Sequence, residues 1–259
     1  SVRSKSLAGK SMAALELKRT RRTEGELAGL FDHVLITSQM DKDELLRLMP
    51  PGKMAAPISI LPNGVDVDFF RRKTSHPRDA ETIVFTGKMS YHANISMVDY
   101  LVNEIMPKVW AKRPTVKLVI VGKDPPRKIR ELTRNPLIEV TGTVDDIRPY
   151  LWRATMAVVP LVYGAGIQNK ILEAMASETP VITTSAAISS LQASPNTDAL
   201  IADKADDFSE AILRLIENQA LQSTIGRAGF LYVNAYHDWS KTASQLIGIW
   251  LPELHAPLA

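Results

Sequence analysis

A lysine and a glutamate lie three positions apart directly behind a glycine turn, in the sequence GAGIQNKILEAMA. Gly164 and Gly166 allow a sharp turn and leave room for a ligand, because neither carries a β-carbon. The amides of Gly166 and Ile167 would then open a helix, and a helix N-terminus favours an anion. Lys170 would add a full positive charge to a phosphate held there, and the Glu173 carboxylate would accept hydrogen bonds from hydroxyl groups. This combination suits a sugar nucleotide, with its diphosphate on the turn and its ribose on the carboxylate.

The same spacing also fits a purely structural arrangement. On a helix that starts near Ile167, the side chains of Ile171, Leu172 and Met175 project together towards a sheet. The lysine and the glutamate then share the opposite side, where an exposed pair adds roughly a few tenths of a kcal/mol to helix stability. The spacing alone therefore leaves both interpretations open.

Strands and helices alternate regularly from about residue 81 onwards. Short apolar runs rich in β-branched residues predict buried strands, and the stretches between them predict helices. The expected strands are 82–87, 117–122, 138–142, 156–161, 180–184 and 199–203, and the expected helices are 94–113, 125–134, 144–154, 167–176, 205–217 and 219–235. The pattern predicts an α/β fold of the Rossmann-like, doubly wound type, with helices on both faces of a parallel sheet. Such sheets bind ligands where the carboxyl ends of strands lead into helices, and the glycine turn is one of these places.

Residues 32–63 form a smaller group, with a strand expected at 33–38, a helix at 41–49, and a strand that runs into a turn at 58–66. Residues 6–30 have helical character. This part has too few strands for a domain of its own, so we expect it to be the tail of something larger or one flank of the main sheet.

The composition excludes several classes of protein. The chain has 259 residues, of which 45% are hydrophobic and 23% charged, as in ordinary soluble globular proteins. No apolar run approaches the roughly 20 residues that cross a bilayer, and no signal peptide opens the sequence, so we expect a cytoplasmic protein. There is no cysteine for a disulfide or a thiolate metal site, and the five histidines are scattered. We therefore expect neither a metal site nor a cofactor.

The charge is distributed unevenly. The net charge is +3, but residues 1–22 set seven basic side chains against Glu16 alone: Arg3, Lys5, Lys10, Lys18, Arg19, Arg21 and Arg22. Such an arm can contact the anionic inner face of a membrane or a nucleic acid, or it can simply be the solvated face of a helix. No aromatic residue interrupts it, which argues against single-stranded nucleic acid. We expect no nucleic-acid partner and leave peripheral contact with an anionic membrane as an open expectation.

Five stretches occur in an order that is typical of one enzyme family. Together they resemble the C-terminal, donor-nucleotide-binding half of a retaining glycosyltransferase of family 4 with the GT-B fold, of the bacterial polysaccharide-biosynthesis type. The stretches are ILPNGVDVDFF (60–70), FTGKMSYHAN (85–94), LVIVGKDPP (118–126), VTGTVDDIRPYL (140–151) and GAGIQNKILEAMASETPVI (164–182). The resemblance covers about residues 30–240, and the last stretch carries a G-x-x-x-K-x-x-E version of the donor motif.

The resemblance implies a role for each matching residue. Glu173 would hold the ribose hydroxyls, and Gly87 and Lys88 would meet the donor diphosphate. Two further loops would complete the site, with the nucleobase edge met by the backbone of Gly142, Thr143 and Val144, and the phosphate side formed by Gly164, Ala165, Gly166, Ile167 and Lys170.

The resemblance also implies a division of the chain. Residues 1–60 would be the end of an N-terminal domain, residues 61–240 the donor-binding domain, and residues 241–259 a C-terminal helix or tail. Asn63 and Gly64 would lie in the linker between the domains. The family's acceptor site and catalytic residues belong to the N-terminal domain, so we expect them outside this sequence.

The sequence departs from the family at two positions of the expected site. Ala165 stands where the family has a glutamate that contacts hydroxyls of the donor sugar. Asn94 stands where a second cation is often found, so Lys170 is expected to take over that role.

The expected function is that of a retaining, hexosyltransferase-type glycosyltransferase. It would take a sugar from a UDP- or GDP-sugar donor and pass it to a glycan or lipid-linked acceptor. No metal is expected, because lysines and turn amides would meet the charge on the leaving diphosphate. The alternative is a non-catalytic sugar-nucleotide-binding or interaction module, which Ala165 and the missing acceptor half support. A nicotinamide-dependent oxidoreductase fits less well, because GKMSYHAN replaces the G-x-G-x-x-G turn of that class.

Overall fold

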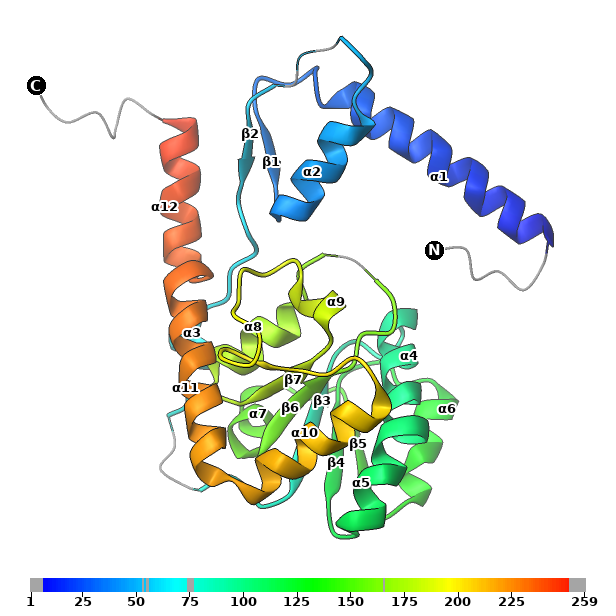
Figure 1. Ribbon diagram of the computed structural model, residues 1–259, viewed down its shortest axis with the longest axis vertical. Coiled ribbons are helices and arrows are strands. Elements are labelled where there is room, and N and C mark those ends of the chain that lie inside the picture. The colour runs from blue at the N-terminus through cyan, green and yellow to red at the C-terminus, as the bar shows by residue number, and fades with distance from the viewer. Residues whose placement is uncertain (1–6, 53, 55, 74–76, 165, 252–259) are drawn as a thin grey trace, which may run out of the picture.

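The chain folds around two parallel sheets (Figure 1). The computed structural model describes residues 7–52, 54, 56–73, 77–164 and 166–251, without the side chains of residues 7–14 and 18. The small sheet pairs β1 (Val34–Ile36) with β2 (Ile58–Ile60). The large sheet contains β3 (Thr82–Thr86), β4 (Lys117–Val121), β5 (Ile138–Gly142), β6 (Met156–Val159), β7 (Val181–Thr183) and β8 (Leu200–Ile201).

The large sheet has the strand order β5-β4-β3-β6-β7-β8, and every neighbouring pair is parallel. β3 is the first strand of this sheet along the chain, and β4 and β5 are added on one side of it. The chain then returns to the other side of β3, where β6, β7 and β8 follow in order. This is the doubly wound, Rossmann-like order, which confirms the expected fold class. The direction of strand addition reverses between β3 and β6, and ligands bind at this point in sheets of this type.

Helices cover both faces of the large sheet. The first half contributes α4 (His92–Tyr100), α5 (Met106–Lys112), α6 (Arg127–Arg130) and the 3-10 turn η2 (Glu131–Arg134), and the second half contributes α8 (Asn169–Ala176), α9 (Ser185–Ile188), α10 (Ala205–Glu217) and α11 (Gln219–Tyr236). The short α3 (Val67–Phe70) precedes β3, and α7 (Arg148–Arg153) connects β5 to β6. Right-handed crossovers place α4 and α8 on opposite faces, because the chain moves in opposite directions from β3 and from β6. α10 packs against α5, and α11 packs against α8.

The two central strands are buried along their whole length. Every residue of β3 and of β6 is buried, as their continuous apolar runs suggest. The loops at the reversal point extend from these two strands. The first residues of each loop are therefore held by a buried strand end.

The helix expected at 94–113 is interrupted. α4 ends at Tyr100, and a π-helical turn, η1 (Leu101–Ile105), joins it to α5. Pro107 has no amide hydrogen to continue the regular ladder, and the Met106 amide donates to the Leu101 carbonyl five residues back. A proline inside an expected helix predicts a kink or an end there, and the interruption lies directly before Pro107.

The N-terminal unit, residues 7–60, contains α1 (Leu7–Leu27), β1, α2 (Gln39–Leu48) and β2, and stands apart from the large sheet (Figure 1). At the other end of the chain, α12 (Trp239–Trp250) follows α11 and runs towards the same side as this unit. A groove of about 410 Å³ lies between the N-terminal unit, the segment after α9, and α11 with α12. No helix in the described part of the chain is long and apolar enough to cross a membrane.

Candidate functional site

The reversal point of the large sheet brings two of the expected site loops together. Gly87 and Lys88 directly follow β3, and the glycine turn of residues 164–168 follows β6. The two strands are paired through Ile83 and Val84, so their loops leave the sheet side by side. The loop after β5 lies two strands further along the same edge. The topology therefore gathers all three expected donor loops at the carboxyl end of the sheet.

The helix behind the glycine turn begins later than expected. α8 starts at Asn169, and Gly166 has a φ of +82°, a left-handed value that glycine tolerates best. Gly166 and Ile167 therefore lie in the turn and not in the first helical turn, which corrects the expected start near Ile167. Gln168 occupies the N-cap position and makes no side-chain capping bond, so α8 opens without a side chain on its first amides.

The helix presents the faces that its spacing predicts. Ile171, Leu172 and Met175 are buried in the core, whereas Lys170 and Glu173 are partly buried on the other side. Among the described residues, no ion pair joins Lys170 to Glu173. The simple alternative of an exposed lysine–glutamate pair on a helix surface therefore does not describe this site.

Lys170 reaches across to the first half of the domain. Its Nζ donates to Asn94 Oδ1 at 2.6 Å and lies 4.4 Å from the centre of the Phe85 ring. Asn94 Nδ2 in turn donates to the carbonyl oxygen of Lys88 at 2.8 Å. One amide side chain thus links the cation on α8 to the loop after β3.

Gly87 makes room for this arrangement. A β-carbon at Gly87 would lie 2.7 Å from Asn94 Nδ2 and 2.9 Å from Lys170 Nζ. A β-carbon at the neighbouring Gly122 would lie 1.8 Å from the Gly87 carbonyl oxygen. Glycine at both positions therefore lets two strand ends and a buried cation approach each other.

Burial changes the acid–base properties of both charged side chains. Removal from water lowers the pKa of Lys170 to about 7, although the nearby Glu173 charge opposes this shift. Burial likewise raises the pKa of Glu173, and the Lys170 charge opposes it. Each group would be more fully charged beside a partner of opposite charge, and a phosphate at Lys170 would be such a partner.

The other expected residues differ in how they meet solvent. Lys88 is exposed at the start of its loop, Gly164 is exposed, and Ala165 lies outside the described residues. Gly142 has a φ of +69°, and Thr143 next to it is exposed. Val144 packs against the core, so it anchors the loop rather than opening it.

Asn94 is the side chain whose importance the sequence indicated least. The sequence marked it only as a departure from a cationic position, and the structure places the Lys170 ammonium against that same side chain. Asn169 was not expected either. Its Oδ1 accepts a hydrogen bond from Asn63 Nδ2 at 3.0 Å, which ties the linker to the first residue of α8. Neither contact has a local sequence signal, because the partners are 76 and 106 positions apart.

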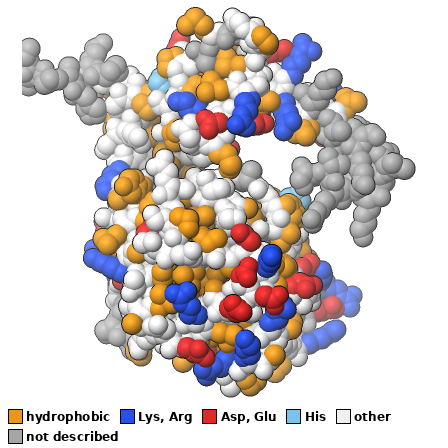
Figure 2. Space-filling view, in the orientation of Figure 1, with side chains coloured by type: hydrophobic (Ala, Val, Ile, Leu, Met, Phe, Trp, Pro, Cys, Tyr) orange, Lys and Arg blue, Asp and Glu red, His pale blue; other side chains and the backbone are white. Residues whose placement is uncertain are grey.

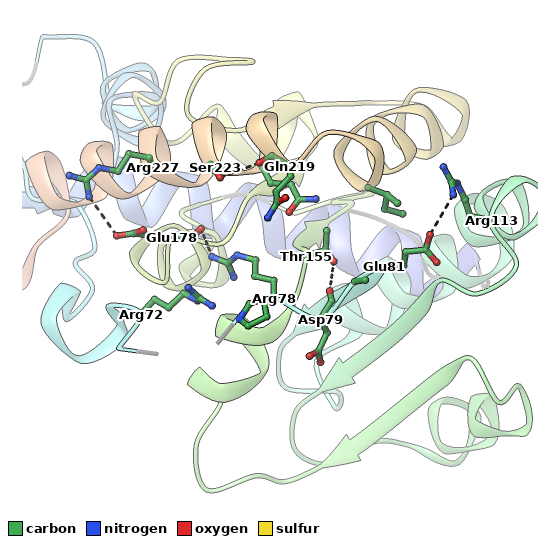
Figure 3. A pocket seen from close by; sticks show the side chains of 14 residues that line it. Arg72, Arg78, Asp79, Glu81, Arg113, Thr155, Glu178, Gln219, Ser223 and Arg227 are labelled. Atoms are coloured by element: carbon green, nitrogen blue, oxygen red, sulfur yellow. Dashed lines mark hydrogen bonds and ion pairs between the residues drawn. The ribbon is translucent and has the colours of Figure 1, made fainter. Parts of the chain in front are cut away.

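A cleft of about 720 Å³ lies at the opposite end of the sheet (Figure 3). Asp79 and Glu81 line it just before β3, and Thr155 lines it just before β6, so it lies at the amino ends of the strands. Arg78 crosses it to donate to the carbonyl oxygens of Trp152, Ala154 and Glu178. Burial lowers the pKa of Arg78 to about 10.

The remaining arginines of this cleft are engaged as well. Arg113 pairs with Glu81 and Glu217, and Arg227 pairs with Glu178. These contacts connect neighbouring elements, so we assign this cleft a structural role.

Two of the three basic side chains of the arm that the structure describes form ion pairs. Arg21 lies 3.5 Å from Glu44 on α2, and Arg22 donates to Glu26 at 2.8 Å. Figure 2 shows basic and acidic side chains interspersed on the N-terminal unit. Arg3 and Lys5 lie outside the residues that the structure describes, as do the side chains of Lys10 and Lys18.

No group of three or more histidine, aspartate or glutamate side chains gathers as metal ligands within the described residues.

A family model described as Glycosyl transferases group 1 matches residues 80–218, which is more than half of the chain. The chain belongs to this family. The match begins just before β3 and ends after α10, so it contains the reversal point and all three loops of the site.

One curated relative of this group 1 glycosyl transferase is the phosphatidyl-myo-inositol mannosyltransferase of Mycolicibacterium smegmatis. It is 25% identical over 227 residues, which cover 84% of this chain and 58% of the relative. The chain therefore spans little more than half the length of that protein.

Solved structures share the fold. Sucrose-phosphate synthase from Thermosynechococcus elongatus superposes with a TM-score of 0.73 at 22% identity, over 92% of this chain and 63% of that one. HepE from Anabaena, in complex with UDP and glucose, superposes with a TM-score of 0.72 at 15% identity, over 90% of this chain and 67% of that one. The Rossmann-like sheet with helices on both faces thus corresponds to the C-terminal half of the GT-B architecture.

Proposed function

We propose that this chain is the donor-binding half of a retaining glycosyltransferase of family 4. It would bind a nucleotide-diphospho-sugar at the reversal point and serve the transfer of the sugar to a glycan or lipid-linked acceptor. The observation that carries the proposal is the convergence of Lys170, the loop after β3 and the uncapped start of α8 at one place.

The diphosphate would lie between the glycine turn and the loop after β3. Lys170 is already aimed at the end of β3, and the exposed Lys88 is free to approach from its loop. The first amides of α8 add donors with a favourable dipole direction. Glu173, one helical turn behind Lys170, would accept hydrogen bonds from the ribose, since no described side chain donates to its carboxylate.

This arrangement acts on the leaving group. When the glycosidic bond to the phosphate breaks, negative charge grows on the nucleoside diphosphate, and fixed amides and cations lower the barrier. Lysines and amides of the chain would supply that stabilisation, so we propose that no divalent metal is needed. Transfer activity of the complete enzyme is then expected to persist in excess EDTA, and its loss there would contradict this part.

UDP is the first ligand to test. HepE from Anabaena is described in complexes with UDP and with UDP-glucose, and TarM from S. aureus in a complex that includes UDP. These ligands belong to those proteins. They make UDP the leading choice for this chain, with GDP beside it.

Paired titrations of UDP and uridine by calorimetry test the site. Glu173→Ala is expected to weaken both ligands alike, roughly tenfold or more, because a hydrogen bond to a charged group contributes about 1.5–3 kcal/mol. Lys88→Met is expected to weaken UDP and leave uridine unchanged. Lys117→Met, at the exposed first position of β4, is the control that leaves both unchanged. Unchanged UDP affinity in Glu173→Ala would remove the ribose assignment.

A non-catalytic sugar-nucleotide-binding module remains the second candidate, because Ala165 replaces the glutamate expected to contact the donor sugar. A module would bind UDP-sugar without consuming it. Slow release of free sugar from UDP-sugar by the full-length protein would favour the enzyme.

A further inference from the structure

Asn94 uses both ends of its side-chain amide. Its Oδ1 accepts from Lys170 Nζ at 2.6 Å, and its Nδ2 donates to the Lys88 carbonyl at 2.8 Å. An ammonium can only donate and a carbonyl can only accept, so these two partners fix which end of the amide faces which. The side chain is only 7% exposed, so water does not compete freely for either bond.

The hydrogen bond to Asn94 restrains the Lys170 side chain, which is otherwise flexible. A lysine has four rotatable bonds in its stem, and holding it in one conformation costs entropy. Lys170 is held at one end by its helix and at the other by Asn94, with the Phe85 ring beside the ammonium. The ammonium is thus placed at the end of β3 before any ligand arrives.

The Asn94 amide oxygen that accepts from Lys170 carries no net charge, and this affects how Lys170 can bind an anion. A carboxylate at position 94 would also accept from the ammonium, but it would cancel the charge of Lys170 and could not donate to the Lys88 carbonyl. The amide holds it and leaves that charge available for an anion. The charged group that acts on Lys170 is Glu173 on its own helix, and among the described residues the two form no ion pair.

We propose that Asn94 is a positioning residue that aims the Lys170 ammonium at a diphosphate while leaving its charge uncompensated. The inference rests on the proposed function and deepens it, because it assigns the second phosphate cation to α8 and its alignment to α4. The loop after β3 takes part through the Lys88 carbonyl, so one hydrogen-bonded chain links the Lys170 ammonium to the backbone of that loop.

Calorimetry on four proteins tests this assignment: wild type, Asn94→Ala, Lys170→Met and the double variant, each titrated with UDP and with uridine. Asn94→Ala is expected to lose about tenfold in UDP affinity and nothing in uridine affinity. Lys170→Met is expected to lose more, again for UDP only. In the double variant, UDP affinity is expected to equal that of Lys170→Met, because Asn94 acts through the lysine.

Asn94→Asp is the matched variant, since it keeps size and shape while adding a negative charge. It is expected to weaken UDP binding more than Asn94→Ala and to keep the wild-type melting temperature within a few degrees. Equal losses for UDP and uridine in Asn94→Ala, or additive losses in the double variant, would overturn the positioning role. A wild-type chain that binds neither UDP nor GDP would instead overturn the proposed function, and this inference with it.

Discussion

The Lys170 ammonium lies among an amide, an aromatic ring and glycine backbone rather than in water. This environment lowers the pKa of Lys170 to about 7, mainly through desolvation. The charge of this cation therefore depends on pH in the range where enzymes work. A diphosphate favours the charged form, so ligand binding and proton binding at this lysine assist each other.

The sign of the pH effect follows directly. Above the pKa of about 7 the free chain holds Lys170 mostly neutral, and binding a diphosphate takes up a proton. UDP affinity is therefore expected to fall as pH rises from about 7, by at most about tenfold per pH unit. Calorimetry at about pH 8 in two buffers of different ionisation enthalpy measures the uptake. Lys170→Met should take up less, and equal uptake in both proteins would assign the proton to another group.

At the scale of elements, glycines set how closely helices and strands approach. Gly226 on α11 faces the Glu178 carbonyl oxygen behind α8, and a β-carbon there would lie 2.3 Å from it. The site helix is therefore held from behind by a backbone contact that has no room for a side chain.

Gly226→Ala tests this contact. Alanine is favoured over glycine in a helix by about 1 kcal/mol, yet the clash is expected to make the variant less stable by about 1–3 kcal/mol. Thr224→Ala, at an exposed position of the same helix, is expected to be neutral or slightly stabilising. Chemical denaturation of both variants gives the comparison. A more stable Gly226→Ala would show that α11 and α8 can separate without cost.

The sequence predicted the elements better than their ends. The strands of the large sheet were expected within a few residues, because buried parallel strands have continuous apolar runs, and those of β3, β4 and β5 stop at a glycine. The start of α8 was placed two residues early, since Gly166 and Gln168 have backbone angles that composition does not specify. The π-helical turn before Pro107 and the short α3 and α9 were not expected. In the site, motif residues were assigned in advance, but the Lys170–Asn94 contact depends on the pairing of β3 with β6 and could not be.

At the scale of the whole molecule, two segments lie between the large-sheet domain and the elements beside the N-terminal unit: the linker after β2 and the junction of α11 with α12. Hydrogen bonds join these two segments. Val65 in the linker donates to the His237 carbonyl at 2.7 Å and accepts from the Trp239 amide at 3.2 Å. His237 Nδ1 bonds to the Asn63 carbonyl at 2.8 Å, and its Nε2 bonds to Tyr232 Oη at 2.8 Å. Gly64 lies against the Trp239 ring, where a β-carbon would approach to 2.6 Å.

His237 makes this junction sensitive to acid. The Asn63 carbonyl only accepts, so Nδ1 carries the hydrogen and Nε2 accepts from the Tyr232 hydroxyl. Burial lowers the pKa of His237 below its ordinary value, so the unfolded chain binds this proton more readily than the folded one. The stability contributed by the neutral ring is present above about pH 6.5 and is lost as pH falls through the lowered pKa.

His237→Gln is expected to melt at a lower temperature than wild type at neutral pH, with a loss of about 1–3 kcal/mol from the buried hydrogen bonds. The difference in melting temperature should shrink as pH falls from about 7 to about 5, because wild type loses its advantage there. Thermal melts across that range measure it. A constant difference would mean that the ring stays neutral or that its charge is tolerated.

The contact between Gly64 and Trp239 makes this tryptophan an intrinsic fluorescence probe of the linker. The indole is about half exposed, with one part of the ring against the linker backbone. Any swing of the N-terminal unit about the joined segments must alter how much water surrounds this ring. Replacing the other three tryptophans with phenylalanine would isolate the fluorescence of Trp239. The wavelength of its emission maximum would then report movement of the N-terminal unit without an attached dye.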